Sequence, residues 1–218
     1  MATRIKICCI TSPEEAQLAI RLGADALGLV SAMPSGPGVI SEALIGEIAQ
    51  AVPPPVGTFL LTSKTTAGEI VLQQKRCRTG TIQIVDRVPP AVHMELRQVL
   101  PGVSLVQVIH VRGDEAVDEA LDCALGVDAL LLDSGQPDSP TRQLGGTGRT
   151  HDWSLSAEIV RRSPVPVFLA GGLTPDNVAQ AIARVRPFGV DVCSGVRQEN
   201  KLSEPKLAQF MSEVQKAG

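Results

Sequence analysis

Short apolar runs alternate with segments of helical spacing along the chain, and this alternation constrains the fold more than any other feature of the sequence. Each run is continuously apolar or nearly so, which is typical of strands buried on both faces of a parallel sheet. The strands we predict are Ile5–Cys9, Ala26–Val30, Gly57–Leu61, Thr81–Val85, Ser104–Ile109, Ala129–Leu132, Val167–Ala170 and Val190–Ser194. Helical spacing is clear in Pro13–Leu22, Ser41–Ala51, Val92–Leu100, Glu115–Leu121, Ser154–Arg162 and Thr174–Arg184.

Local signals mark several helix ends. Thr11–Glu14 offers a capping hydroxyl followed by proline and an acid, and Thr174–Asp176 repeats that pattern before a later helix. Gly23 follows the first helix at the position where helices commonly end in glycine. These signals support helices between the strands.

Strands that alternate with helices allow two architectures, a closed (β/α)8 barrel and an open doubly wound sheet. No G-x-G-x-x-G motif follows the first strand, which weakens the dinucleotide-binding form of the open sheet. No linker interrupts residues 1–218, so we predict one α/β domain. A chain of 218 residues lies toward the short end for a barrel, which starts at about 200.

Composition argues against several classes of protein. Hydrophobic residues make up 44% of the chain, yet no apolar run reaches the roughly 20 residues of a membrane-spanning helix. Met1–Arg4 leads straight into an apolar strand without the layout of a signal peptide, so we expect a cytoplasmic protein. A net charge of −3, the lack of a basic run and an aromatic content of 2% argue against nucleic-acid binding.

The cysteines do not suggest a framework of cross-links. Their number, five, is odd, and no C-x-x-C pair is present, which argues against structural disulfides and against a zinc site. Any one of them can be a small buried apolar residue. The cysteines are Cys8, Cys9, Cys77, Cys123 and Cys193.

Glycine-rich loops follow three of the predicted strands. Gly171-Gly172 comes after the seventh strand and Ser194-Gly195 after the eighth, where barrels often bind phosphate. Glycines let backbone N–H groups approach a ligand, and the N-terminus of a following helix favours an anion. Either loop alone is better explained by a tight turn, but together they favour a phosphate site. Gly146 and Gly148 lie in a third such loop, after the sixth strand.

Two cysteines and two aspartates are candidates for chemistry at the strand ends. Cys8 and Cys9 are neighbours in extended chain, so at most one of them faces the barrel interior with Lys6. Asp133 ends an apolar run, where poor solvation raises the pKa of a carboxyl as a general acid needs; capping the next turn is the alternative. Asp191 either orients a ligand hydroxyl or satisfies a partner inside the barrel.

Several segments together resemble the phosphoribosylanthranilate isomerase family of tryptophan biosynthesis. The opening Lys6–Thr11 is similar to the K-I-C-G-I-T of that family, and Ala24–Gly28 is similar to its second-strand signature. The second half of the chain is closer still, because four motifs follow in order with suitable spacing. They are Leu131–Ser134, Gly145–Trp153, Leu169–Val178 and Gly189–Val196.

This resemblance implies a (β/α)8 (TIM) barrel that converts N-(5-phosphoribosyl)anthranilate to an aminodeoxyribulose phosphate by an Amadori rearrangement, with no cofactor and no metal. By motif position, Cys8 would be the general base and Asp133 the general acid. The partner would be a small phosphorylated molecule, and we expect no nucleic acid, no membrane, and a monomer or homodimer. The residues that would bind substrate or phosphate are Gly146, Gly148, Gly171, Gly172, Asp191, Ser194 and Gly195.

The first half of the chain departs from the family pattern. Cys9 stands where the family usually has glycine, Gln83–Asp86 replaces its Q-L-H-G, and Met33–Gly38 lacks the Arg that faces the anthranilate. An Arg fork on a carboxylate is worth about 1.5–3 kcal/mol, so another cation would have to substitute. Two alternatives therefore stay open: an isomerase of another phosphorylated sugar or aminosugar, and a non-catalytic phosphosugar-binding protein. The candidate cations are Arg87, His110 and Arg149.

Overall fold

A closed parallel barrel is the centre of the computed structural model, which describes residues 2–34, 36–135 and 151–218. Within these residues the strands follow one another in chain order, and β8 pairs back onto β1 with Ile5 beside Val190. The strands are β1 (Arg4–Ile7), β2 (Ala26–Val30), β3 (Gly57–Thr62), β4 (Thr81–Ile84), β5 (Ser104–His110), β6 (Ala129–Asp133), β7 (Val167–Leu169) and β8 (Gly189–Val192). The closure confirms the (β/α)8 barrel and excludes the open doubly wound sheet.

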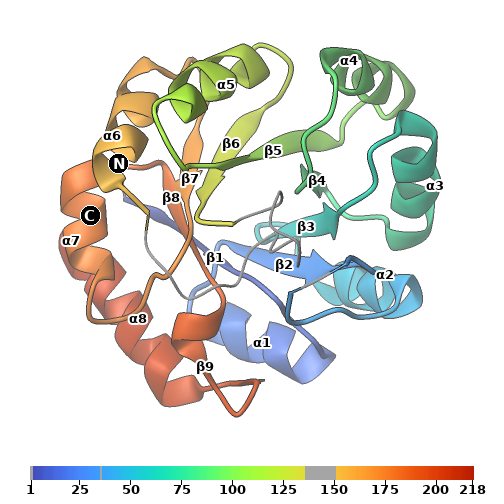
Figure 1. The fold of residues 1–218 in the computed structure, drawn as a ribbon. Helices are drawn as coiled ribbons and strands as arrows, with labels where there is room; N and C mark the ends of the chain where they lie inside the picture. Colours follow the sequence, from blue (N-terminus) through green and yellow to red (C-terminus); the bar gives the residue numbers. More distant parts are fainter. Residues whose placement is uncertain (1, 35, 136–150) are drawn as a thin grey trace.

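Helices form an outer ring around the strands (Figure 1). A short 3₁₀ helix, η1 (Ser194–Val196), and a ribbon of β9 (Arg197–Gln198) and β10 (Lys201–Leu202) precede the last helix. The helices of the described residues are α1 (Pro13–Arg21), α2 (Glu42–Ala51), α3 (Ala67–Cys77), α4 (Pro90–Val99), α5 (Glu115–Ala124), α6 (Trp153–Arg162), α7 (Val178–Val185) and α8 (Glu204–Ala217). None of them is long and apolar enough to cross a membrane.

The first helix begins and ends where its sequence signals predict. The Ser12 hydroxyl accepts a hydrogen bond from the Glu15 backbone N–H at 3.3 Å, and Pro13 occupies the first turn. Gly23 ends the helix with φ at +100°, a conformation that suits glycine. The predicted boundaries of α1 are therefore confirmed to within one residue.

The prediction that a helix starts at Thr174 is wrong, because α7 begins at Val178. The Asn177 side chain accepts a hydrogen bond from the Thr174 backbone N–H and donates one to the Gly172 carbonyl, both at 2.9 Å. These bonds close a turn that competes with the helix, as Asn side chains commonly do. Gly171 and Gly172 therefore lead into a turn, and the start of α7 lies further along the chain.

The core has an inner and an outer part. Alternate side chains of each strand point inward, where Phe59 and Phe168 pack edge to face with ring centroids 6.1 Å apart. Their neighbours in sequence, such as Leu60 and Leu169, are buried against the helices. Fully burying a side chain of this size stabilises the fold by about 1.5–3 kcal/mol. Two-sided burial explains why the strands are continuous apolar runs.

Candidate active site

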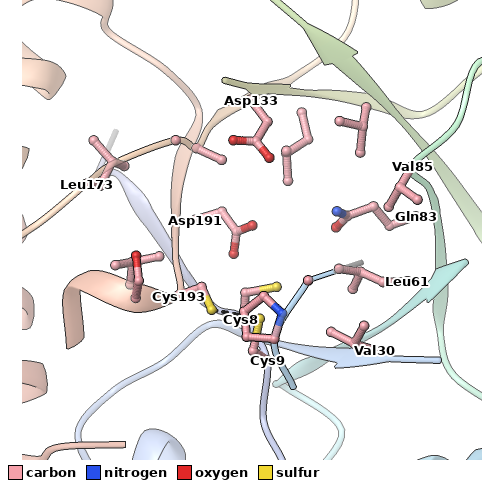
Figure 2. A pocket seen from close by; sticks show the side chains of 18 of the residues that line it. Cys8, Cys9, Val30, Leu61, Gln83, Val85, Asp133, Leu173, Asp191 and Cys193 are labelled. Atoms are coloured by element: carbon pink, nitrogen blue, oxygen red, sulfur yellow. Dashed lines mark hydrogen bonds between the residues drawn. The ribbon is translucent and has the colours of Figure 1, made fainter. Parts of the chain in front are cut away.

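A pocket opens at the carboxyl end of the barrel strands (Figure 2). The side chains of Cys8, just after β1, Asp133 on β6 and Asp191 on β8 point into it. Leu61, Val85 and Leu131 supply apolar wall, and the segment after β2 contributes Met33, Gly36 and Pro37. This is the end of the barrel where enzymes of this fold carry their sites.

Cys8 lies one residue beyond β1 and is held by the neighbouring strand. Its backbone N–H donates a hydrogen bond of 2.8 Å to the carbonyl of Val192, and only 6% of its surface is exposed. Gly28 on β2 has no side chain, and a Cβ there would lie 2.9 Å from Cys8 Sγ and 3.1 Å from Lys6 Nζ. The thiol and the lysine ammonium are therefore both packed against the same glycine.

Asp133 is the last residue of β6, and its carboxyl is buried. Burial raises its pKa above the usual value for aspartate, although the electrostatic influence of His110 on the adjacent strand acts against this. One carboxyl oxygen accepts a hydrogen bond of 2.7 Å from the Ser134 backbone N–H. Gly171 lies so close that a Cβ there would be 3.1 Å from Asp133 Oδ1. The raised pKa favours the protonated acid.

Asp191 forms an ion pair with Lys6 inside the barrel. Their charged atoms are 3.0 Å apart, and the Lys6 side chain is completely buried. Burial alone would lower the pKa of Lys6, but the Asp191 carboxylate raises it, so the lysine carries its charge. The same ammonium lies 5.2 Å from the centre of the Phe59 ring. Of the two roles expected for Asp191, the structure therefore shows a barrel-interior partner, while Asp191 also lines the pocket.

A second cavity adjoins the pocket, and the loops after β7 and β8 form it. Gly172, Leu173 and Ser194 line both spaces, and Gly195 lines the second. The two loops touch, because a Cβ on Gly195 would lie 2.0 Å from the Leu173 carbonyl oxygen. Lys206 on α8 adds a positive charge, and its ammonium donates a hydrogen bond of 3.0 Å to the Arg197 carbonyl. Sequence reasoning missed Lys206, because α8 was not among its predicted helices.

The three cations proposed as substitutes for the family Arg lie in different places. Arg87 forms a two-pronged ion pair with Glu119, and both line a groove between α4 and α5 away from the pocket. The Nε2 atom of His110 forms a hydrogen bond of 3.0 Å with the Val85 carbonyl. Arg149, like Gly146 and Gly148, lies outside the described residues. Among the described residues that line the pocket, none is Arg or Lys.

A closed (β/α)8 barrel with ionisable side chains gathered around a pocket at its carboxyl end defines the class of barrel enzymes. The family model described as N-(5'phosphoribosyl)anthranilate (PRA) isomerase matches residues 5–213. The chain belongs to this family and is an isomerase.

Individual relatives agree along nearly the whole length. The N-(5'-phosphoribosyl)anthranilate isomerase of Methanocella arvoryzae is 36% identical over 213 residues, covering 97% of this chain and 98% of that protein. The enzyme of Haloarcula marismortui is 39% identical over 195 residues, covering 89% of this chain and 87% of the relative. The crystal structure of the Thermotoga maritima isomerase matches with a TM-score of 0.84 at 29% identity, covering 97% of this chain and 98% of the other.

A further solved structure holds a ligand. It is a phosphoribosyl anthranilate isomerase in complex with reduced 1-(o-carboxyphenylamino)-1-deoxyribulose 5-phosphate. It matches with a TM-score of 0.81 at 27% identity and covers 97% of this chain and 98% of that chain. The ligand of that relative is a small phosphorylated molecule.

Proposed function

We propose that this pocket isomerises N-(5'-phosphoribosyl)anthranilate, with Cys8 as the general base and Asp133 as the general acid. One observation carries the proposal: the thiol and the carboxyl enter the same pocket from β1 and β6 (Figure 2). A binding protein would have no need of an acid and a base on separate strands. The adjoining cavity at Gly172, Ser194 and Gly195 supplies a place for a phosphate beside them.

The acid acts first in this mechanism. Asp133 donates a proton to the ribose ring oxygen, and the ring opens to an iminium ion. Burial keeps the pKa of Asp133 raised, so that a protonated carboxyl is available for this step. The positively charged nitrogen then makes the proton on C2 acidic.

The base completes the rearrangement. The thiolate of Cys8 removes the C2 proton, and the resulting enolamine tautomerises to the aminodeoxyribulose phosphate. Over the whole reaction the substrate gains and loses no net atoms, as an isomerisation requires. Each of the two groups would contribute a rate factor of roughly 10²–10⁴.

The phosphate end of the substrate would lie across the loops that follow β7 and β8. Backbone N–H groups near Gly172 and Gly195 would donate to phosphate oxygens, since both glycines line the second cavity and glycine lets the backbone approach a ligand. The Lys206 ammonium has three donors and uses one of them on the Arg197 carbonyl. It is therefore available as a cation for the phosphate.

Removing either proposed catalytic group should abolish isomerisation. We expect Cys8→Ser and Asp133→Asn each to lower kcat by roughly 10²–10⁴-fold. Both variants should also fail to restore growth without tryptophan in a bacterium that lacks this isomerase. The matched control is Cys123→Ser, which removes a thiol from α5 outside the pocket and should leave kcat unchanged. Full activity in either pocket variant would contradict the assignment. A folded wild-type chain that fails to complement would point to another phosphorylated sugar.

A further inference from the structure

Two cysteines touch each other at the edge of the pocket. The Sγ atoms of Cys9 and Cys193 are 2.7 Å apart, and Figure 2 shows both beside Cys8. They stand 184 positions apart in sequence. Barrel closure brings them together, because β1 and β8 pair with Ile7 beside Val192 and both cysteines follow these strand ends. Disulfide sulfurs lie about 2.05 Å apart, so the two atoms need to approach by less than about 1 Å to bond.

The backbone holds Cys9 in an unusual conformation. Its φ is +62°, in the left-handed region that few side chains adopt outside Gly, Asn and Asp. The related family usually has glycine at this position, which suits that conformation. This chain therefore keeps a strained thiol where glycine would be relaxed. Strained residues persist when the surrounding structure holds them, and they cluster at functional sites.

The pKa values of the two thiols are shifted in opposite directions. Contact with Cys9 and the nearby Arg197 guanidinium lower the pKa of Cys193, whereas hydrogen bonding to Cys193 and Cys8, together with burial, raises the pKa of Cys9 well above its usual value. When the pair loses a proton, Cys193 is thus the side chain that loses it. A thiolate beside a cation is the reactive form of cysteine. Cys193 is also the more exposed of the two.

We propose that Cys9 and Cys193 form a reversible disulfide when the chain meets a small-molecule disulfide such as oxidised glutathione. The Cys193 thiolate attacks one sulfur of that molecule, breaks its S–S bond and releases one small thiol. Cys9, after losing its proton, attacks the Cys193 sulfur of the mixed disulfide, and the second small thiol leaves. Two protein thiols are oxidised and one small disulfide is reduced to two thiols.

The remaining cysteines contrast with this pair. Burial raises the pKa of Cys77 to about 12 and that of Cys123 to about 11, so neither is a ready nucleophile. Cys8 is not consumed by the cross-link. The bond would instead join the loop that carries Cys8 to the loop that carries Ser194 and Gly195. Oxidation would therefore tie together two parts of the pocket wall.

The test counts free thiols after equilibration with glutathione buffers of increasing oxidised fraction. Wild-type chain should change from five alkylatable thiols to three, with a loss of two hydrogen atoms that dithiothreitol reverses. Peptide mapping should join Cys9 to Cys193. Cys9→Gly should form no internal cross-link and should stop at the mixed disulfide, with one glutathione on Cys193 and three free thiols, whereas Cys193→Ser should keep four free thiols at the same buffer ratio. Cys9→Gly also restores the residue that suits a positive φ, so it should fold.

Two controls separate this pair from other pairings. Cys123→Ser and Cys8→Ser should each still lose two thiols on oxidation, because neither removes a member of the pair. Five free thiols in the wild-type chain at every buffer ratio would overturn the proposal. A cross-link that persists in Cys9→Gly would also overturn it, since Cys8 would then be the partner of Cys193. Neither result depends on which residues catalyse isomerisation.

Discussion

Lys6 and Asp191 place two opposite charges where the barrel interior excludes water. Each charge needs the other, because burying an unpaired charge destabilises the fold far more than burying a paired one. The pair is supported by the 3.0 Å contact and by the Phe59 ring beneath the ammonium. Asp191 also lines the pocket, so the pair lies next to it.

Removing one charge of this pair should therefore destabilise the fold more than removing both charges. Lys6→Met leaves the Asp191 carboxylate buried without a partner, and we expect a loss of about 3–5 kcal/mol in the free energy of unfolding. The double variant Lys6→Met/Asp191→Asn should recover part of that loss, because no charge remains. Urea denaturation of the wild type, both single variants and the double variant measures the coupling. Additive effects would show that the two side chains do not stabilise each other.

The pH dependence of activity should report Asp133. In the proposed mechanism Asp133 is protonated and Cys8 is deprotonated, so the wild-type kcat/KM should decline on the alkaline side as the acid is lost. Burial raises the pKa of Asp133, so the protonated form persists to a higher pH than for an exposed aspartate. The residual activity of Asp133→Asn should only rise with pH. If the alkaline decline survives in that variant, another group is the acid.

At the scale of the elements, apolar runs predicted every strand of the described barrel to within two residues at either end. The start of α7 was less predictable, because Thr174–Asp176 carries a capping pattern that the Asn177 side chain overrides. The contact between the loops after β7 and β8 could not be predicted from the sequence either. It depends on how far apart two chain segments lie after the barrel closes.

That contact gives the second cavity its shape, and Gly195 is the residue that permits it. Gly195→Ala would place a Cβ 2.0 Å from the Leu173 carbonyl oxygen, so the loops must separate. We expect KM for the phosphorylated substrate to rise by about tenfold, corresponding to about 1.4 kcal/mol of lost binding. Steady-state kinetics on the purified variant measures this change.

The matched control is Gly68→Ala in α3, where a Cβ would meet nothing within 4 Å. Alanine is the better helix former, so this variant should be as stable as the wild type or more so, with KM unchanged. An unchanged KM in Gly195→Ala, with folding intact, would mean that the loop contact does not shape the proposed phosphate site.

For the whole molecule, barrel closure is what made much of the site predictable. Once eight alternating units are assigned to a barrel, the residues after each strand must meet at one end, which placed Cys8 and Asp133 in one pocket. The same logic did not reveal Cys9 with Cys193 or Lys6 with Asp191. Those contacts depend on side-chain directions and on the register between β1 and β8, which the sequence does not encode locally.

One buried and one half-buried histidine, His93 and His151, should make the whole fold sensitive to acid. His93 on α4 bonds to Gln107 on β5 at 2.9 Å, and His151 bonds to Ser156 on α6 at 2.6 Å. Burial lowers the pKa of both, that of His151 from 6.5 to about 4. Because the unfolded chain then binds protons more readily than the folded chain, stability should fall as the pH drops from 6.5 towards 4.

The urea midpoint at pH 7 and at pH 5 measures this effect. We expect His151 to account for about 1–2 kcal/mol of the loss in the free energy of unfolding between these values. His151→Gln cannot take up a proton, so its stability should fall less than that of the wild type over the same interval. An equal fall in both proteins would assign the acid sensitivity to other groups. The carboxylates of Glu15 and Glu42, whose pKa values are lowered in the fold, should contribute only as the pH falls below their unfolded value of 4.5.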